Sequence, residues 1–465
     1  MNQINNGSIY HPLKVDQWNG VNWNKVEKTI ALLQHRITKA TKDGNYRKVR
    51  NLQRLLLTSM SARLKAVRLV TREQLGEKTP GIDGIIWTTP EHKLQATLDL
   101  KNRSKTLPLR RVCILEPNGS KLSLAIPSIK DRARQVLWNL GLLPIVEVNS
   151  NARSCGFHSN RRACNANTQL RNFLNKPTSP RWILHGKIEK YCDQLNHNWL
   201  LNSAPMETKV LKSWLKVGYF EASKFFSKNE EVLRESAISE TLVNLTLNGL
   251  EQAIVEKIKP VRNYQTEKGF SKKSSFKVNV VRHADDFIIT GKTVHQLEIV
   301  KKIVAEFLEI RGLKLSDSQT SIHRIEDGFN FLGWTFRSQN GKLLSKISDK
   351  SISEHKRAIK YITKTNHNSS LLIHKLNSTI RGWITYHRLC NDIGKVWSNM
   401  NKYLFDRLMK WGLRRHGRKS RKWIFLKYWK KIYNRWTFTV RGNSQNANLM
   451  SYSCRHNPIL NINRI

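Results

Sequence analysis

The stretch Val280–Ile289 restricts what this chain can fold into more than any other. β-branched and aromatic residues stand on both sides of two adjacent acids, Asp285 and Asp286, which is typical of a β-hairpin with the acids at its turn. Two neighbouring carboxylates in an apolar hairpin repel each other and lose hydration when they are buried. Metal ions or positively charged side chains must offset that cost, so the residues facing this turn decide what it can do.

The chain is strongly basic along its whole length. Its 465 residues include 81 Lys and Arg against 34 Asp and Glu, which gives a net charge of +47. Solubility needs far less charge than this, so the excess indicates a polyanionic partner. The 14 Trp residues favour a nucleic acid over a membrane surface, because aromatic rings stack on unpaired bases.

Length and composition predict two to four packed domains without a membrane anchor. No run of 18 apolar residues is present, and Met1–Gly20 has neither an apolar signal core nor an Arg-rich presequence. The six cysteines are scattered and contain no Cys-x-x-Cys pair, which argues against a zinc site or a disulfide framework.

Hydrophobic periodicity predicts the helices, and runs of β-branched residues predict the strands. A helix is expected over residues 24–40, followed by a second helical run from Arg47 to Leu64. Arg110–Leu115 and Lys121–Pro127 are expected to pair as a hairpin through an Asn-Gly turn. Further helices are expected over residues 131–146 and 295–311, and within 351–380, where residues 366–370 separate them. A long helical run is expected through Trp397, Leu404, Leu408 and Trp411.

A series of short motifs occurs in a fixed order along the chain. They are Thr-Pro-Gly-Ile-Asp-Gly (79–84), Arg-Arg-Val (110–112), Pro-Asn-Gly (117–119), Ile-Pro-Ser-Ile-Lys-Asp-Arg (126–132), Gly-Phe-x-x-x-Arg (156–161), Ala-Asp-Asp (284–286), Phe-Leu-Gly-Trp (331–334) and Arg-Gly-Trp (381–383). This order resembles that of the group II intron-encoded reverse transcriptases, also called maturases. The resemblance extends over roughly residues 15 to 440, and it rests on the order of the motifs rather than on any single one.

The resemblance implies an α+β fold, a right-hand polymerase with fingers and palm followed by an α-helical thumb and maturase domain. It divides the chain into a loose N-terminus (1–22), N-terminal helices and fingers (23–175), a degenerate palm (176–340), a thumb and RNA-binding maturase domain (341–440) and a truncated tail (441–465). Many relatives continue into an endonuclease with paired cysteines, where this sequence has only the stub Ser453–Pro458. We therefore expect no DNA-cleaving module.

The resemblance also locates a departure at the expected active site. In the family, the strand before the Ala-Asp-Asp hairpin carries the first Asp of the metal-binding triad, and Lys187 stands at that position here. An ammonium group cannot bind Mg²⁺, so we expect no catalytic residue, with Asp285 and Asp286 vestigial and Lys187 neutralising both of them directly. Glu189, two residues along the same strand face, is the alternative third ligand, roughly 6.6 Å away.

Three other departures affect positions that handle nucleotides in the family. The segment Val232–Ser236 lacks the Pro, Gln and two Gly expected to seat template and nucleotide. Leu122 replaces the Arg expected to meet the triphosphate, and His283 replaces a Tyr. Together with Lys187, these changes predict a polymerase fold that no longer polymerises.

The most basic part of the sequence lies near its C-terminal end. Residues 401–440 contain 13 Lys and Arg, with four Trp interleaved. They could form an exposed basic loop over buried Trp, or an RNA cradle in which cations bind phosphates and rings stack on bases. The resemblance favours the cradle. Its expected RNA-binding residues are Arg381, Trp383, Arg414, Arg415, His416, Arg418, Lys419, Arg421, Lys422, Trp423 and Lys427.

The function expected from the sequence is that of an intron maturase. It would bind a group II intron RNA and assist its folding and splicing, with no cofactor of its own and Mg²⁺ present only through the RNA. Alternatives are an active reverse transcriptase with a substituted metal ligand and a non-specific RNA chaperone. An organelle-encoded protein is expected, in a chloroplast rather than a mitochondrion, or else a bacterial cytoplasmic one, and a homodimer stays open.

Overall fold

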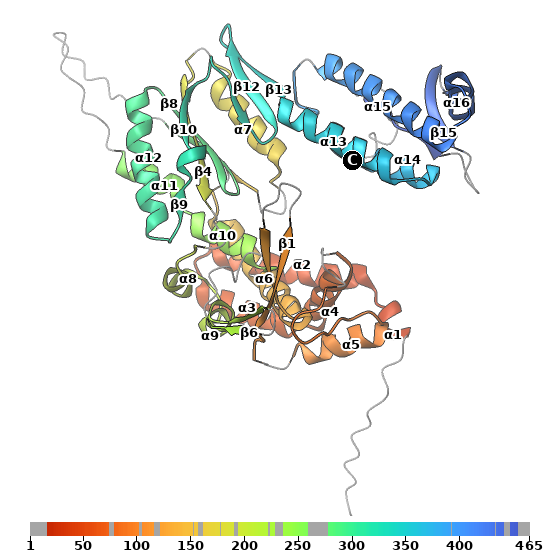
Figure 1. Cartoon of the computed structure of the whole chain (residues 1–465). Coiled ribbons are helices and arrows are strands. Elements are labelled where there is room, and N and C mark those ends of the chain that lie inside the picture. The colour runs from red at the N-terminus through yellow and green to blue at the C-terminus, as the bar shows by residue number, and fades with distance from the viewer. Residues whose placement is uncertain are drawn as a thin grey trace, which may run out of the picture. The chain divides into compact units, whose positions relative to one another are not determined.

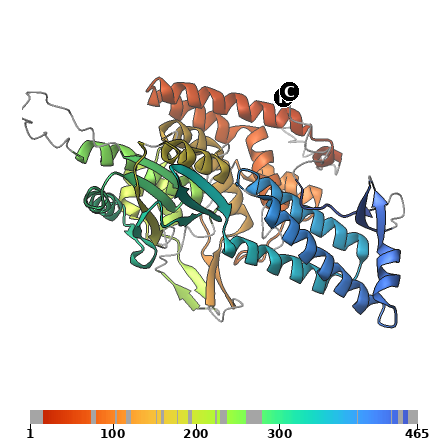
Figure 2. The same ribbon diagram turned by 90° about the horizontal axis from the view of Figure 1, so that it is seen from above.

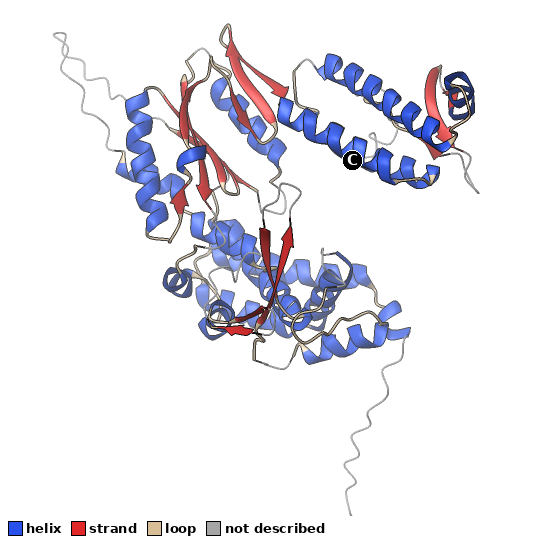
Figure 3. Cartoon of the chain, in the orientation of Figure 1, coloured by secondary structure: helices blue, strands red, loops and turns tan. Residues whose placement is uncertain are grey.

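The structure is a computed structural model. It describes residues 16–73, 79–101, 105–115, 121–151, 153–156, 161–176, 178–189, 194–221, 224–227, 236–258, 278–391, 393–432, 434–440 and 447–453. Helices and strands alternate along most of the chain, which confirms the α+β class (Figure 3). The chain forms two compact units. The first contains residues 1–161, 184–289 and 295–321, and the second contains 162–183, 290–294 and 322–465.

Helices at the N-terminus build the first core of the first unit. They are α1 (Asp16–Asn19), α2 (Trp23–Lys42), α3 (Tyr46–Thr58), α4 (Met60–Arg68), α5 (Pro90–Asp99) and α6 (Ile129–Asn149). The expected helix over 24–40 is α2, while the second helical run is two helices, because Ser59 is extended and ends α3. The apolar stripe of α3, with Val49, Leu52 and Leu56, is buried in this core.

Two sheets lie wholly or mostly in the first unit. One has the strand order β2-β1-β5-β6, where β1 (Leu109–Leu115) and β2 (Lys121–Ile126) form the predicted hairpin and β5 (Tyr219–Glu221) lies parallel to β1. The other has the order β10-β4-β8-β7-β3, with β9 pairing with β4. Its strands are β3 (Ser154–Cys155), β4 (Trp182–Glu189), β7 (Asn279–His283), β8 (Asp286–Gly291), β9 (Lys314–Leu315) and β10 (Ser321–Arg324). In the four-stranded sheet, β6 is Lys224–Phe226.

The predicted acidic hairpin is β7 and β8, joined through Ala284 and Asp285. The helices that accompany these sheets along the chain are α7 (Ala163–Leu174), α8 (His197–Ser203), α9 (Thr208–Leu215), α10 (Ser239–Leu247), α11 (Leu250–Lys257) and α12 (Val294–Glu309). The predicted helix over 295–311 is α12, whose stripe of Leu297, Val300 and Leu308 is buried. Gly312 follows it at φ 76°, a left-handed conformation that glycine adopts without strain.

Helices form most of the second unit (Figure 1). They are α7, α13 (Asp349–Thr365), α14 (Ser369–His387), α15 (Ile393–Arg415) and α16 (Arg421–Tyr428). Helix α13 packs against both α14 and α15 (Figure 2). A three-stranded sheet of β11 (Phe329–Phe331), β12 (Trp334–Gln339) and β13 (Lys342–Ile347) comes before α13. A second one follows α16, with β14 (Trp429–Ile432), β15 (Arg435–Val440) and β16 (Ala447–Asn448), which the sequence did not predict.

In the described ranges, none of the helices combines the length and the apolar character that crossing a bilayer requires.

Candidate functional site

One face of β4 is directed at the acidic turn. Burial alternates along the strand, with Leu184, Gly186 and Ile188 buried and His185 and Lys187 partly accessible. The buried face packs tightly, because a Cβ on Gly186 would lie 2.3 Å from Cζ of Phe287. His185, Lys187 and Glu189 therefore share the other face, as the predicted alternation requires.

Hydrogen bonds hold the acidic turn against β4 and β3. The Ile188 N–H donates to the Asp285 carbonyl over 2.9 Å, and the Ala284 N–H donates to the Cys155 carbonyl over 3.0 Å. Ala284 adopts a φ of 57°, which is unusual for a residue with a side chain. The surroundings thus impose this turn conformation and fix where both carboxylates start.

A buried arginine supports the turn from behind. Arg282 is 3% exposed, and its Nη1 donates to Asn244 Oδ1 over 3.2 Å and to the Ala284 carbonyl over 3.1 Å. Loss of hydration lowers the pKa of Arg282 to about 10, so the side chain is still charged at neutral pH. It contributes a positive charge and a brace to the hairpin.

The two carboxylates have different partners. His185 Nε2 lies 2.8 Å from Asp286 Oδ1, a hydrogen bond that becomes an ion pair when the imidazole is protonated. Burial raises the pKa of Asp285, while a backbone hydrogen bond and the nearby positive charge of Lys187 act in the opposite direction. The expectation that Lys187 neutralises both acids directly is therefore wrong for Asp286, which pairs with His185.

His185 was missed in the sequence although it lies two residues before Lys187 on the same strand face. The period-two alternation places it correctly, but only the pairing of β4 with β8 shows which acid it reaches. His283, on β7, is the other imidazole near the acids. Burial lowers its pKa, which favours the neutral form.

The residues around the turn do not fit the pair of Mg²⁺ ions that the polymerase fold uses. An ammonium group stands where a third carboxylate is needed, and Asp286 already bonds to an imidazole. Glu189 is exposed and pairs in register with Lys314. Within the described residues, no three His, Cys, Asp or Glu side chains are grouped to hold a metal ion.

The other expected losses are only partly visible. Residues 232–235 and the side chain of Leu122 lie outside the described residues, so the departures proposed there stay predictions.

Two of the expected RNA-binding arginines bond to the protein itself. Arg414 Nη2 donates to the Thr363 carbonyl over 2.8 Å, and Arg415 Nη1 donates to the His367 carbonyl. Trp411 Nε1 donates over 2.8 Å to the carbonyl of Asn366, which lies between Thr363 and His367 in the sequence. These carbonyls lie at the C-terminal end of α13, where the helix leaves acceptors unsatisfied and favours positive charge. Arg414 and Arg415 therefore have a structural role, whatever they do for RNA.

Trp383 is directed into the second unit. Its ring stacks on His355 with 4.1 Å between centroids, and its Nε1 donates to Ser351 Oγ over 3.4 Å. Trp397 and Tyr452 meet it edge-on. The structure gives Trp383 a packing role, and its proposed RNA contact stays a prediction.

Six of the remaining eight expected residues form an exposed group around α16. We call it the α16 basic surface, and it consists of Arg418, Lys419, Arg421, Lys422, Trp423 and Lys427, all exposed. Lys427 Nζ lies 4.7 Å and Lys419 Nζ 5.4 Å from the Trp423 ring centroid, both within cation–π range.

His416 and Arg381 lie outside that surface. His416 Nε2 bonds to the Tyr428 hydroxyl over 2.8 Å, and its ring meets Trp423 edge-on. Arg381 is exposed on α14. Trp436 on β15, one of the four interleaved Trp, is also exposed. Sequence reasoning missed the exposed Tyr361 on α13, which is flanked one turn away by Arg357.

Three family models match consecutive parts of the chain. The N-terminal domain of reverse transcriptase matches residues 18–100, the reverse transcriptase (RNA-dependent DNA polymerase) domain 114–336, and the group II intron maturase-specific domain 352–429. The chain belongs to the group II intron reverse transcriptase and maturase family.

Relatives of this maturase-family chain come from a bacterium and from euglenids. Protein YkfC of Escherichia coli is 28% identical over 315 residues, covering 61% of this chain and 82% of the relative. Maturase-like protein 1 of Euglena gracilis is 25% identical and that of Euglena longa 23%, covering 82% and 80% of this chain and 79% and 78% of the relatives.

A solved structure similar to this maturase-family chain is telomerase from Candida albicans in complex with a fragment of telomeric RNA. It shares 10% identity with a TM-score of 0.33, covering 69% of this chain and 64% of that one. The family models establish the expected fold, with reverse transcriptase fingers and palm. The matched maturase-specific region runs from α13 to the start of β14 and includes the α16 basic surface.

Proposed function

We propose that this chain is a splicing maturase that binds a group II intron RNA and does not polymerise. One observation carries the proposal. The exposed cations and Trp423 of the α16 basic surface lie in the matched maturase-specific region, whereas the acids of the polymerase turn face His185 and Lys187. The chain has kept an RNA-binding surface and lost its metal ligands.

In this function the RNA carries out the chemistry and the protein supplies binding energy. Contacts made only with the folded intron shift the RNA toward its splicing-competent form, because a ligand stabilises the state to which it binds. Cations that bind phosphates without reading bases suit this task, since the folded shape sets where the phosphates lie. No metal ion bound by the protein takes part.

The α16 basic surface is tested by removing its charges. Arg418, Lys419, Arg421 and Lys422 are changed together to Gln, and affinity for the intron is measured at several salt concentrations. Because each lost phosphate contact reduces the salt slope by about 0.7 to 0.9, we expect the loss of four contacts to lower the slope by about three and affinity to fall at least tenfold.

A matched control removes the same charge elsewhere. Lys209, Lys212, Lys216 and Lys224 are exposed residues of the first unit, and their replacement by Gln should leave the slope within about one of the wild type. Equal losses in both variants would show that overall charge, not this surface, binds the intron.

The absence of polymerisation is tested by primer extension with Mg²⁺ or Mn²⁺. We expect no product from the wild type, and none from Lys187→Asp, because His185 still bonds Asp286 and the departures at 232–236 remain. Robust synthesis that Asp285→Ala abolishes would instead establish the alternative, an active reverse transcriptase with a substituted ligand such as Glu189.

A non-specific RNA chaperone is the second candidate, favoured by the high positive charge of the whole chain. Its mark would be equal affinity for the host intron and for an unrelated structured RNA of the same length at moderate salt.

The proposal includes an organelle or bacterial gene, with a chloroplast favoured over a mitochondrion. What supports it is the presence of relatives in Escherichia coli and Euglena. The position of the gene, inside a group II intron or free-standing, tests it, and light scattering of the free protein tests the possible homodimer.

A further inference from the structure

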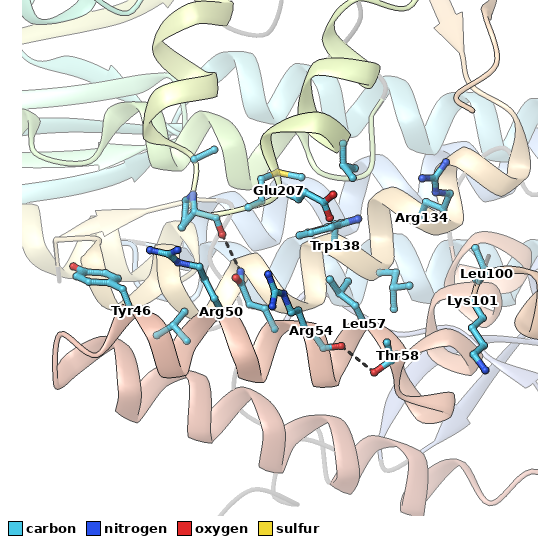
Figure 4. Close-up of a pocket in the computed structure, with 17 residues that line it drawn as sticks. Tyr46, Arg50, Arg54, Leu57, Thr58, Leu100, Lys101, Arg134, Trp138 and Glu207 are labelled. Carbon is cyan, nitrogen blue, oxygen red and sulfur yellow. Dashed lines mark hydrogen bonds between the residues drawn. The ribbon is translucent and has the colours of Figure 1, made fainter. Parts of the chain in front are cut away.

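The first unit contains a groove that neither the acidic turn nor the α16 basic surface uses. It has a volume of about 800 Å³ and lies between α3, the C-terminal end of α5, α6 and the linker from α8 to α9 (Figure 4). This volume is within the range of about 300 to 1,000 Å³ that is usual for sites of small ligands. The groove is therefore large enough to hold a small organic ligand.

The polar lining of the groove is predominantly cationic. Four positive side chains, Arg50, Arg54, Lys101 and Arg134, line it together with one carboxylate, Glu207. Arg50 and Arg54 are exposed and one turn apart on α3, so both follow the same wall (Figure 4). Their spacing suits an anion with more than one oxygen, such as a phosphate.

The groove also has an aromatic and apolar wall. Trp138 on α6 is half-buried, and Leu57 and Met206 line the groove with it. Figure 4 shows the Trp138 ring beyond Arg54 as seen from α3, with Glu207 beside it. A flat ring in such a wall is a stacking partner for a nucleobase, and a carboxylate next to it can accept a hydrogen bond from a base amino group.

The walls of the groove are held together before any ligand binds. Gln53, which is buried, donates from Nε2 to the Gly141 carbonyl over 3.2 Å and to the Pro205 carbonyl over 3.0 Å. One side chain of α3 thereby fixes both α6 and the α8–α9 linker. A preformed site loses less entropy on binding than one that must be assembled.

We propose that this groove binds one unpaired nucleotide of an RNA, with the base against Trp138 and the backbone phosphate on Arg50 and Arg54. The proposal rests on the proposed function to the extent that the chain binds RNA. It adds a second binding site, in the first unit, and a preference for unpaired over paired RNA. An acidic peptide would satisfy the cations but would not use the flat Trp138 wall.

The preference is tested with the full chain and two probes, a single-stranded ten-nucleotide RNA and a blunt ten-base-pair RNA duplex. In Arg50→Gln/Arg54→Gln we expect affinity for the single strand to fall at least tenfold and its salt slope to fall by about 1.4, since two contacts are lost. Binding of the duplex should change less than threefold, because a paired base cannot enter the groove.

The matched control is Arg47→Gln/Lys48→Gln. These two residues are exposed on the same helix, and neither lines the groove. Their replacement removes two positive charges, as the groove variant does. The control should lose less than threefold in affinity for either probe. If it loses as much as the groove variant, or if the groove variant binds the single strand as the wild type does, the proposal is overturned.

The stacking contact is tested separately at Trp138. Trp138→Leu should weaken binding of the single strand by between about five- and a hundredfold, and Trp138→Phe, which keeps a flat ring, should restore most of it. Equal binding by these two variants would overturn the stacked arrangement. Urea unfolding of each variant shows that the unit is still folded.

A direct readout is crosslinking of the ten-nucleotide RNA carrying 4-thiouridine. We expect its crosslinked peptides to include Trp138 or Met206, and crosslinks confined to other peptides would overturn the proposal. Failure here leaves the proposed function intact if the intron still binds through the α16 basic surface. Loss of intron binding by the α16 variant does not affect the groove test.

Discussion

At the scale of single residues, the polymerase turn shows how one substitution changes the role of its neighbours. Lys187 brings a positive charge to Asp285, while His185 bonds Asp286, so each acid has a basic side chain near it. Ion pairs in partly accessible positions contribute little to stability, so this arrangement is best understood as compensation for two acids that the hairpin retains. The packing and backbone hydrogen bonds of the hairpin, not its carboxylates, therefore account for most of its contribution to stability.

That view predicts that the packing behind the turn matters more than its charges. In Gly186→Ala the new Cβ would overlap the Phe287 ring at 2.3 Å, so we expect the free energy of unfolding to fall by about 1 to 3 kcal/mol. Gly382→Ala is the control, because that helical glycine has open space around it and should gain about 0.5 to 1 kcal/mol. Urea unfolding measures both, and equal effects would contradict the role given to Gly186.

At the scale of elements, α13 connects the parts of the second unit. Its C-terminal end accepts hydrogen bonds from Arg414 and Trp411 of α15, and its His355 packs between α14 and the segment that contains Tyr452. Arg414→Ala should therefore lower the stability of this unit as well as its positive charge. A splicing defect in that variant would not by itself identify an RNA contact, which is why exposed cations of α16 make the better test.

The histidines next to Trp383 predict a pH dependence of the second unit. His355 is 6% exposed and His387 1% exposed, and burial lowers the pKa of each from 6.5 to about 4. Both are thus neutral when folded, while the unfolded chain binds protons below about pH 6.5. The free energy of unfolding is therefore undiminished by these two histidines above about pH 6.5, and it falls as the pH is lowered from 6.5 toward 4.

Proton binding by the unfolded chain should lower the free energy of unfolding by roughly 2 kcal/mol per histidine at pH 5. We expect urea unfolding, followed by near-UV circular dichroism of the Trp-rich second unit, to show lower stability at pH 5 than at pH 7. His387→Gln should reduce the difference, and an unchanged pH dependence in that variant would show that other groups cause it.

At the scale of the whole molecule, the net charge of +47 governs encounters with any RNA. Six to ten phosphate contacts would make affinity fall by roughly 10³ to 10⁵ between 50 and 200 mM salt by the duplex-DNA rule. Specific recognition must then appear as the difference between RNAs at the higher salt concentration. The two units can both contribute to it, each through its own surface.

We therefore expect the host intron and an unrelated structured RNA to bind with similar affinity at 50 mM salt, and the intron to bind at least tenfold more tightly at 200 mM. Filter binding across the salt series measures both. The reason is that non-specific binding is almost wholly electrostatic, whereas contacts fitted to one RNA shape are less sensitive to salt. Equal affinities at 200 mM would support the chaperone alternative.

The sequence by itself determined the elements and the class of fold. The acidic hairpin, the N-terminal helices and the helices from α12 to α15 follow from local periodicity, because burial of one face imposes the period of a helix or a strand. The division of the second helical run at Ser59 and the strands β14 and β15 were not predicted. In the latter case a basic, Trp-rich segment does not alternate clearly between polar and apolar residues.

Only the tertiary structure decided which side chains meet. The bond between His185 and Asp286 joins residues 101 positions apart, and Arg414 reaches Thr363 across 51. The groove lined by Arg50, Arg54 and Trp138 exists because α3 and α6 pack together. Composition shows that such residues are present, but strand pairing and helix packing set their distances, and those distances determine whether a charge binds RNA, a helix end or a neighbouring acid.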